Sequence, residues 1–457
     1  MLLFFNALLT LGRLQAATYS GHALMLNQVP RRRSTCFILS IVLGLTGSTL
    51  VASASEMQQP VEGGTSMVIH EDVELTAAQK SNQFRLEIVT YLGFLAIGAC
   101  VGSFLNVVIY RLPNGRSVVG SSSCPACDTQ IQWRHNIPIV GWLRLRGRCS
   151  SCEIKIPARY PAVEALIAGL FVLLLSACLV TGGGNLPIRT PNYYRGVIWV
   201  IWYPQWDLIG IYLFHCCLGC VLIAAALIQW DGHPLPVRLK RFAFGTGLTA
   251  PIFWKHLHPV GAHEPRPDWL TENWRWQVEF TGPVTGWPQN FGVGVDGLID
   301  SVVGFAAGVV AGWLVAKCLG KNTLPAAHTK GFVALFGIVG AFLGWQAMVP
   351  VAIVVAILNV LFGGVGRVTG DRRWGTRTAN AALAAAVLLY IPLWRKLSLW
   401  TWSPDHTGWP LISTTDWWPS KALEPYGSLT LALAVGCLIA ATSRLVSSSE
   451  PASSDTA

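Results

Sequence analysis

Long apolar stretches separated by short polar segments dominate this chain. Eight of them approach or exceed the roughly 18 residues that a helix needs to cross a lipid bilayer. They run from Leu86 to Tyr110, Pro161 to Thr181, Leu208 to Trp230, Gly297 to Cys318, Gly331 to Met348, Val349 to Phe362, Ala379 to Trp394 and Ser428 to Val446. Several are rich in Gly and Ala, which lets helices approach closely in lipid. The pattern predicts an all-α fold, a polytopic transmembrane helical bundle.

Composition and charge support a membrane protein and argue against a nucleic-acid partner. Hydrophobic residues make up 52% of the chain and charged residues 12%, with a mean hydropathy of +0.46, unlike a soluble globular domain. The net charge is +10, but the basic residues gather beside the apolar stretches instead of forming a soluble basic domain. We therefore expect a lipid membrane as partner, no nucleic acid, and a charge pattern that reports topology.

The N-terminal region, residues 1–55, resembles a signal peptide or a first membrane segment. Arg31-Arg32-Arg33 precedes an apolar run from Cys36 to Val51, which is followed by Ala52-Ser53-Ala54. Two interpretations stay open: Met25 is the true start, or the run is an uncleaved first helix. Residues 56–85 are then a polar linker.

Four cysteines lie in a polar loop, residues 111–160, between two predicted spans. They form two CxxC pairs about twenty residues apart, Cys124 with Cys127 and Cys149 with Cys152. This spacing is typical of a closed tetrahedral zinc site with four thiolates. A redox or disulfide pair is the alternative, and an oxidising compartment would favour it. The loop is rich in arginine, so the positive-inside rule predicts a reducing cytoplasmic location. We thus expect a small cytoplasmic zinc-binding loop domain in which the zinc is structural.

The same loop and its flanking spans resemble the N-terminal half of bacterial prepilin peptidases. Five sequence blocks carry the resemblance in order: Gly102-Ser-Phe-Leu-Asn-Val-Val-Ile-Tyr-Arg-Leu-Pro113, the first CxxC, Trp133-Arg-His-Asn-Ile-Pro-Ile-Val-Gly-Trp-Leu143, Arg146-Gly-Arg-Cys-Ser-Ser-Cys152 and Arg159-Tyr-Pro-Ala-Val-Glu164. It implies a multi-pass protein of the bacterial inner membrane. Such enzymes are aspartic peptidases that cleave type IV prepilins and pseudopilins, and many then methylate the new N-terminus. The resemblance thus implies prepilin or pseudopilin signal helices as partners and S-adenosylmethionine as a cofactor for methyl transfer.

Proteolysis of this kind requires two carboxylates that share a proton. The family's first aspartate lies seven residues before the proline of a Leu-Pro pair, which gives Gln229 when Leu235-Pro236 sets the register. Asp231 follows two residues later and is our one candidate catalytic residue. The family's second aspartate corresponds to Phe332, because Gly340 to Trp345 resembles the block after it. Neither replacement can ionise, so the register predicts that the aspartate pair is lost.

Other acids could rebuild the pair, with Asp231 as its main member. These are Asp296, Asp300 and Asp371, which lie near predicted membrane boundaries or inside spans. Asp296 matches a family position that is not catalytic, and Asp371 follows the helices that should come after the site.

The remaining regions depart from the family. We expect an insert loop at 183–206, a peptidase-like membrane core at 207–362 with a long inserted loop at 231–290, C-terminal membrane helices at 363–446 and a disordered tail at 447–457. The longer insert contains aromatic and histidine residues, which suit an interfacial aromatic belt better than a metal site: Trp254, His256, His258, His263, Trp269, Trp274 and Trp276.

Two classes of function are compatible with these residues. The first is an enzyme that acts on pilin or pseudopilin leader sequences as a peptidase, or that retains N-methyl transfer alone. The second is a catalytically lapsed homologue that serves as a pilin-binding protein or an assembly scaffold.

Overall fold

The computed structural model describes residues 77–398, apart from residues 121, 125, 188–195, 198–199, 201–204, 255–256, 261–294, 371–373 and 375–376. The chain divides into two units, and of the unit that ends at Gly93 only residues 77–93 are described. They form the first part of helix α3 (Ala77–Arg111). The second unit includes everything from Phe94 onwards. The predicted signal-like segment at the N-terminus and the predicted span from Ser428 to Val446 lie outside the described residues.

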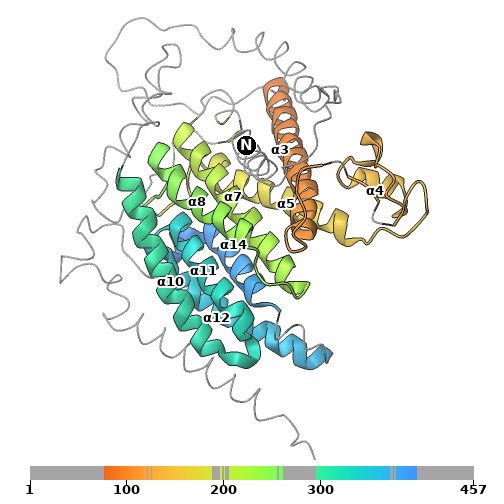
Figure 1. Cartoon of the computed structure of the whole chain (residues 1–457). Coiled ribbons are helices and arrows are strands. Elements are labelled where there is room, and N and C mark those ends of the chain that lie inside the picture. Colours follow the sequence, from red (N-terminus) through yellow and green to blue (C-terminus); the bar gives the residue numbers. More distant parts are fainter. Residues whose placement is uncertain are drawn as a thin grey trace, which may run out of the picture. The chain divides into compact units, whose positions relative to one another are not determined.

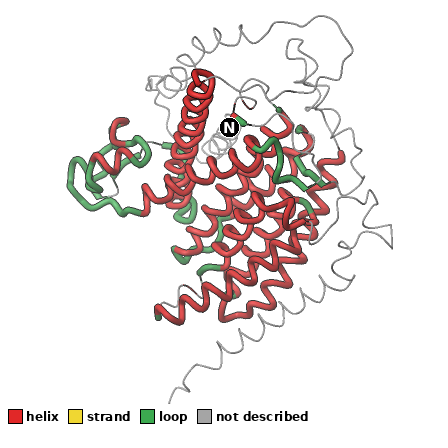
Figure 2. Tube along the Cα trace, turned by 180° about the vertical axis from the view of Figure 1, so that it is seen from behind, coloured by secondary structure: helices red, strands yellow, loops and turns green. Residues whose placement is uncertain are grey.

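The described chain is helical, as Figures 1 and 2 show. After α3 come α5 (Arg159–Leu174) with its π-helical continuation η2 (Leu175–Val180), α7 (Trp206–Trp230), α8 (Val237–Phe253), α10 (Val295–Thr323), α11 (Ala326–Leu343), α12 (Met348–Thr369) and α14 (Ala379–Ser398). Short helices η1 (Trp133–His135), α4 (Val140–Arg144) and η3 (Trp345–Ala347) complete them. Six helical segments are long and apolar enough to cross a membrane, and each matches a predicted span. The protein is therefore an all-helical, multi-pass membrane protein.

Contacts between helix ends show how the helices alternate in direction. Arg159 at the start of α5 pairs with Asp231 after α7, and the backbone N–H of Asn380 in α14 donates to the side chain of Gln229. The start of α5, the end of α7 and the start of α14 therefore lie at one end of the bundle. At the opposite end, the N–H of Arg395 in α14 donates to the carbonyl of Asn185, after η2.

Close helix contacts depend on small residues, as the composition of the spans predicted. A Cβ atom added at Gly98 of α3 would lie 2.8 Å from the Cα of Ala168, and one at Gly102 would lie 2.7 Å from the Cα of Glu164. In α10 and α11, Gly304 and Gly340 face each other, and a side chain on either would collide with the carbonyl of the other. Glycine at these positions lets the backbones touch in a medium where van der Waals packing drives association.

The region from 231 to 290 contains a helix where we expected an inserted loop. Residues 237–253 form α8, which packs against α10 and α11. Its first turns carry Arg238, Lys240 and Arg241, and Pro251 lies near its end. These residues lower the hydropathy of the segment, so the apolar pattern did not reveal a helix that tertiary packing stabilises.

Candidate functional site

The two CxxC pairs fold as matching turns. In each turn, the backbone N–H of the first cysteine donates a hydrogen bond to the carbonyl of the residue five positions later. The backbone N–H of the residue that follows the second cysteine donates a hydrogen bond to the carbonyl of the first cysteine. These bonds are Cys124 to Thr129 (3.0 Å), Asp128 to Cys124 (2.9 Å), Cys149 to Ile154 (2.9 Å) and Glu153 to Cys149 (3.1 Å). Asp128 and Glu153 both have positive φ, 51° and 56°. The repeated geometry aims both sulfur pairs at one point.

The four sulfur atoms lie together as a metal site requires. All lie within 4.8 Å of one another, and the Sγ atoms of Cys124 and Cys152 are 3.8 Å apart. A tetrahedron with Zn–S bonds of about 2.3 Å has sulfur atoms about 3.8 Å apart. The four are free thiols in the structure. The cluster therefore fits a four-coordinate zinc ion with no open position for a reacting water.

The pKa values of the clustered thiols are shifted by their surroundings, two of them downwards and one upwards. Hydrogen bonds with the side chain and backbone of Thr129 lower the pKa of Cys127 to about 6. The backbone around Cys152 and Ser151 likewise lowers the pKa of Cys149. For Cys152, the Ile154 backbone lowers the pKa, but burial and the neighbouring thiols outweigh it and raise the value to about 12. Without a metal, the sulfurs therefore share their negative charge unequally.

The cysteine loop is fastened to the membrane helices by a buried carboxylate. Oε2 of Glu164, in α5, accepts a hydrogen bond from the backbone N–H of Ile139 at 2.6 Å, where the loop turns through a positive φ of 61°. Within the loop, Nε1 of Trp142 donates to the carbonyl of Ile156 at 3.0 Å. A cavity of about 630 Å³ lies between the end of α3, this loop and the start of α5.

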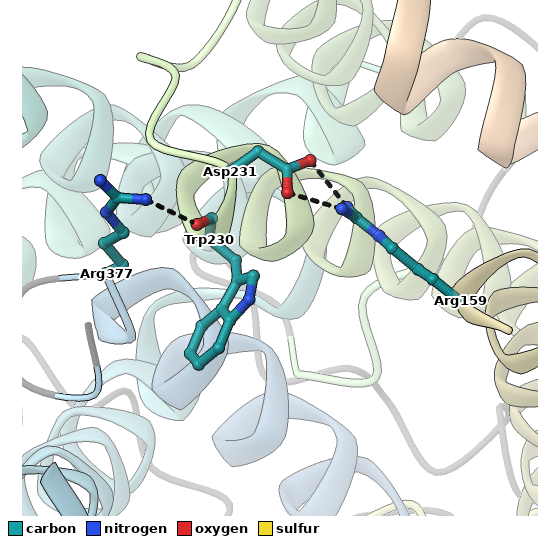
Figure 3. A network of polar contacts seen from close by, with 4 residues as sticks. All are labelled: Arg159, Trp230, Asp231 and Arg377. Atoms are coloured by element: carbon teal, nitrogen blue, oxygen red, sulfur yellow. Dashed lines mark hydrogen bonds and ion pairs between the residues drawn. The ribbon is translucent and has the colours of Figure 1, made fainter. Parts of the chain in front are cut away.

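Asp231 lies beside a second cavity, of about 610 Å³, which is lined by Arg159, Leu227, Trp230, Asp231 and Arg377. Its two carboxylate oxygens accept hydrogen bonds from the two terminal nitrogens of Arg159, at 2.5 and 2.8 Å. Nη1 of Arg377 donates to the carbonyl of Trp230 at 3.3 Å. Figure 3 shows the two arginines approaching the end of α7 from opposite sides. Asp231 is the one acidic residue among the described residues that line this cavity.

The two positions that our register aligns with the family's aspartates are both buried. Gln229 is 1% exposed, and its Oε1 accepts the N–H of Asn380 at 2.8 Å. Phe332 in α11 is 1% exposed and lies edge-on to Phe336 with ring centroids 5.2 Å apart. Neither side chain is an acid, and neither lines the cavity beside Asp231.

The other candidate acids are not brought to Asp231 by the described structure. Asp300 is 3% exposed, and its neighbour Ser301 donates to the carbonyl of Gly247 at 3.0 Å. Gly247 is ten residues into α8, about 15 Å along the helix from the end where Asp231 lies. The side chain of Asp296, and Asp371, lie outside the described residues.

Two residues of the histidine- and tryptophan-rich segment pack inside the bundle, although we expected an interfacial belt. His258 is fully buried, and its Nε2 lies 2.8 Å from the carbonyl oxygen of Ala341. The ring of Trp254 fills the space over Gly210 of α7. His256, His263, Trp269, Trp274 and Trp276 lie outside the described residues.

Comparison with known proteins places this architecture in a family. The model of the bacterial peptidase A24 N-terminal domain matches residues 96–178. A prepilin leader peptidase/N-methyltransferase of Myxococcus xanthus is 28% identical over 316 residues, 66% of this chain and 74% of the relative. The chain is a distant member of the prepilin peptidase family. This confirms the resemblance seen in the five sequence blocks.

Two other prepilin peptidase homologues match different shares of the chain. The Neisseria gonorrhoeae prepilin leader peptidase/N-methyltransferase is 25% identical over 334 residues, 67% of this chain and 93% of its own length. The enzyme of the same name from Stutzerimonas stutzeri is 42% identical over 100 residues, 17% of this chain and 34% of that protein. No solved structure matches the chain significantly.

Two residues of the Asp231 cavity could not be recognised from the sequence. Arg159 belongs to one of the blocks that carry the resemblance, but its ion pair spans 72 positions of the chain. Arg377 is 147 positions from its partner Trp230 and belongs to no block. Arginines are common near the ends of membrane helices, where they set the topology. Only the packing of α5, α7 and α14 shows that Arg159 and Arg377 line the same cavity.

Proposed function

We propose that this protein binds prepilin or pseudopilin leader helices in a bacterial inner membrane without cleaving them. The proposal rests on the surroundings of the Asp231 carboxylate. Among the described residues it is the one acid that lines its cavity, and Arg159 occupies both of its carboxylate oxygens. An aspartic peptidase needs a second carboxylate to share a proton and to divide the acid and base roles. The guanidinium of Arg159 has only N–H donors, so it cannot take the place of that second carboxylate.

The substrate class comes from the relatives. Their names describe prepilin leader peptidases and N-methyltransferases, and one from Escherichia coli is a type 4 prepilin-like proteins leader peptide-processing enzyme. Leader helices of such proteins are apolar and would enter the bundle from the membrane. In the register set by Leu235-Pro236 and by Gly340 to Trp345, Gln229 and Phe332 stand where the family has its catalytic pair.

A second function, N-methyl transfer, is favoured by the cavity beneath the cysteine loop. Its volume is about 630 Å³, within the range of small-molecule and cofactor sites. Residues of α3, the loop and α5 line it, and all of them fall within the region that matches the family model. S-adenosylmethionine is the cofactor that this function would require.

Charge supports a cytoplasmic position for the cysteine loop. The loop shares one end of the bundle with Arg159, Arg377 and the basic first turns of α8, and its own basic residues add to them. Positively charged segments are retained on the cytoplasmic side. Reducing conditions there keep the cysteine thiols available to bind zinc. The bound zinc would hold the loop in the conformation that packs against α5.

The test is expression in membranes together with a prepilin that carries a photo-crosslinking residue in its leader. We expect crosslinking to this protein and no shortening of the prepilin, and the Asp231→Ala variant should behave identically. Loss of the leader in the wild type but not in Asp231→Ala would overturn the non-proteolytic proposal. Absence of crosslinks from folded, zinc-loaded protein would overturn leader binding. Methyl transfer is followed separately, with labelled S-adenosylmethionine and a leader-free pilin.

A further inference from the structure

The cavity beside Asp231 carries an excess of positive charge. Of the described residues, Arg159 and Arg377 line it together with a single carboxylate, which Arg159 already pairs. Within the part of the chain that the structure describes, the Trp230 carbonyl is the one acceptor that Arg377 contacts, at 3.3 Å. A guanidinium has five N–H donors in a planar fork, so most donors of Arg377 are available to a ligand.

The Arg377 side chain packs against a glycine at the end of α7. Its guanidinium lies flat against Gly232, where an added Cβ would be 3.2 Å from the central carbon and both terminal nitrogens. Gly232 has a positive φ of 84°, which suits glycine. The arginine is thus held at the end of α7 by a backbone carbonyl and a glycine, with no carboxylate among the described residues to neutralise it.

The remaining lining residues indicate what kind of anion fits. Leu227 lies one turn before Asp231 on a membrane-spanning helix, and Trp230 lies at the helix end. Tryptophan at this depth belongs to the interface between lipid chains and headgroups. The cavity therefore combines an apolar wall from a membrane-spanning helix with guanidinium groups at the end of that helix.

We propose that this cavity binds the phosphodiester headgroup of an anionic glycerophospholipid, with Arg377 as the principal phosphate ligand. Arginine binds phosphate through paired N–H donors, and basic pockets between membrane helices on the cytoplasmic side suit anionic headgroups. The lipid chains would lie along Leu227. This site is independent of whether the protein cleaves or methylates a substrate.

The experiment is native mass spectrometry of the full-length, zinc-loaded protein in detergent, titrated with phosphatidylglycerol or with phosphatidylcholine of the same chains. We expect wild type to prefer phosphatidylglycerol and Arg377→Gln to lose about tenfold in affinity for it, because a hydrogen-bonded ion pair is removed. Lys330→Gln is the matched control, since Lys330 is an exposed cation in α11 outside the cavity. It should bind as wild type does.

A second variant covers the case in which Arg377→Gln does not fold. Leu227→Trp fills the cavity without removing a charge, and it should also lower phosphatidylglycerol binding. Equal binding by wild type and both cavity variants overturns the proposal. Full displacement of the lipid by millimolar inorganic phosphate would show a free-phosphate site and would overturn the lipid assignment, whereas retention of the lipid supports it.

Discussion

Asp231 and Arg159 form a two-point ion pair, with oxygen–nitrogen distances of 2.5 and 2.8 Å. Arg159 is the first residue of α5, directly after the cysteine loop, and Asp231 follows the last residue of α7. The pair therefore joins the cysteine loop to the end of α7. Arg159 thus occupies the carboxylate two residues after Gln229, where our register places the family's first catalytic aspartate.

Separating this pair should cost little stability. The side chains are 39% and 32% exposed, and exposed ion pairs contribute about 0.2–1 kcal/mol. We expect a double-mutant cycle of Asp231→Asn and Arg159→Gln, followed by unfolding in detergent, to give a coupling of about 1 kcal/mol. A coupling of several kcal/mol would indicate a desolvated pair with a larger role than the geometry supports.

Zinc should be bound by the four cysteines and should hold the loop together. We expect purified protein to contain about one zinc ion per chain, and Cys152→Ser to lose it with increased protease cleavage between residues 112 and 158. Cys318→Ser in α10 is the control, because Cys318 lies outside the cluster. Full zinc retention after single serine substitutions at all four positions would contradict the site.

Metal removal should expose one unusually reactive thiol. The pKa of Cys127 is lowered to about 6, so its thiolate fraction rises as the pH increases through about 6. In chelated protein, iodoacetamide should modify Cys127 at pH 7 well before Cys152, whose pKa is raised to about 12. Peptide mass mapping across pH 5 to 8 measures the order. Thr129→Val should move the Cys127 midpoint to higher pH, because the hydrogen bonds of the Thr129 side chain are lost.

An aspartate placed at position 332, where our register expects the family's second aspartate, should destabilise the protein. Phe332 is buried against Phe336, so Phe332→Asp removes a buried aromatic ring at a cost of about 3–5 kcal/mol and adds the cost of a buried carboxyl group. Phe332→Leu should cost much less, about 1 kcal/mol. Thermal unfolding in detergent separates the two. A stable Phe332→Asp protein would show that this site still accommodates a carboxylate.

The contact between α10 and α11 should not tolerate a side chain at Gly340. An added Cβ would collide with the carbonyl of Gly304, so Gly340→Ala must push the helices apart or unfold them locally. Gly363→Ala in α12 is the control, since nothing lies within 4 Å of the added Cβ. We expect a clear loss of thermal stability in the first variant and none in the second.

The sequence by itself determined the class of protein, six of its spans and the cysteine cluster. Spans are visible because lipid demands long apolar helices, and the CxxC pairs are visible because ligands from one turn are close in sequence. Helix α8 was missed because its basic first turns hide the apolar face that packs on α10 and α11. The ion pair of Asp231, the bond between Gln229 and Asn380 and the position of Arg377 were decided by tertiary structure alone. Each joins helices that are far apart in the chain, and helix packing, unlike turn geometry, leaves no fixed spacing in the sequence.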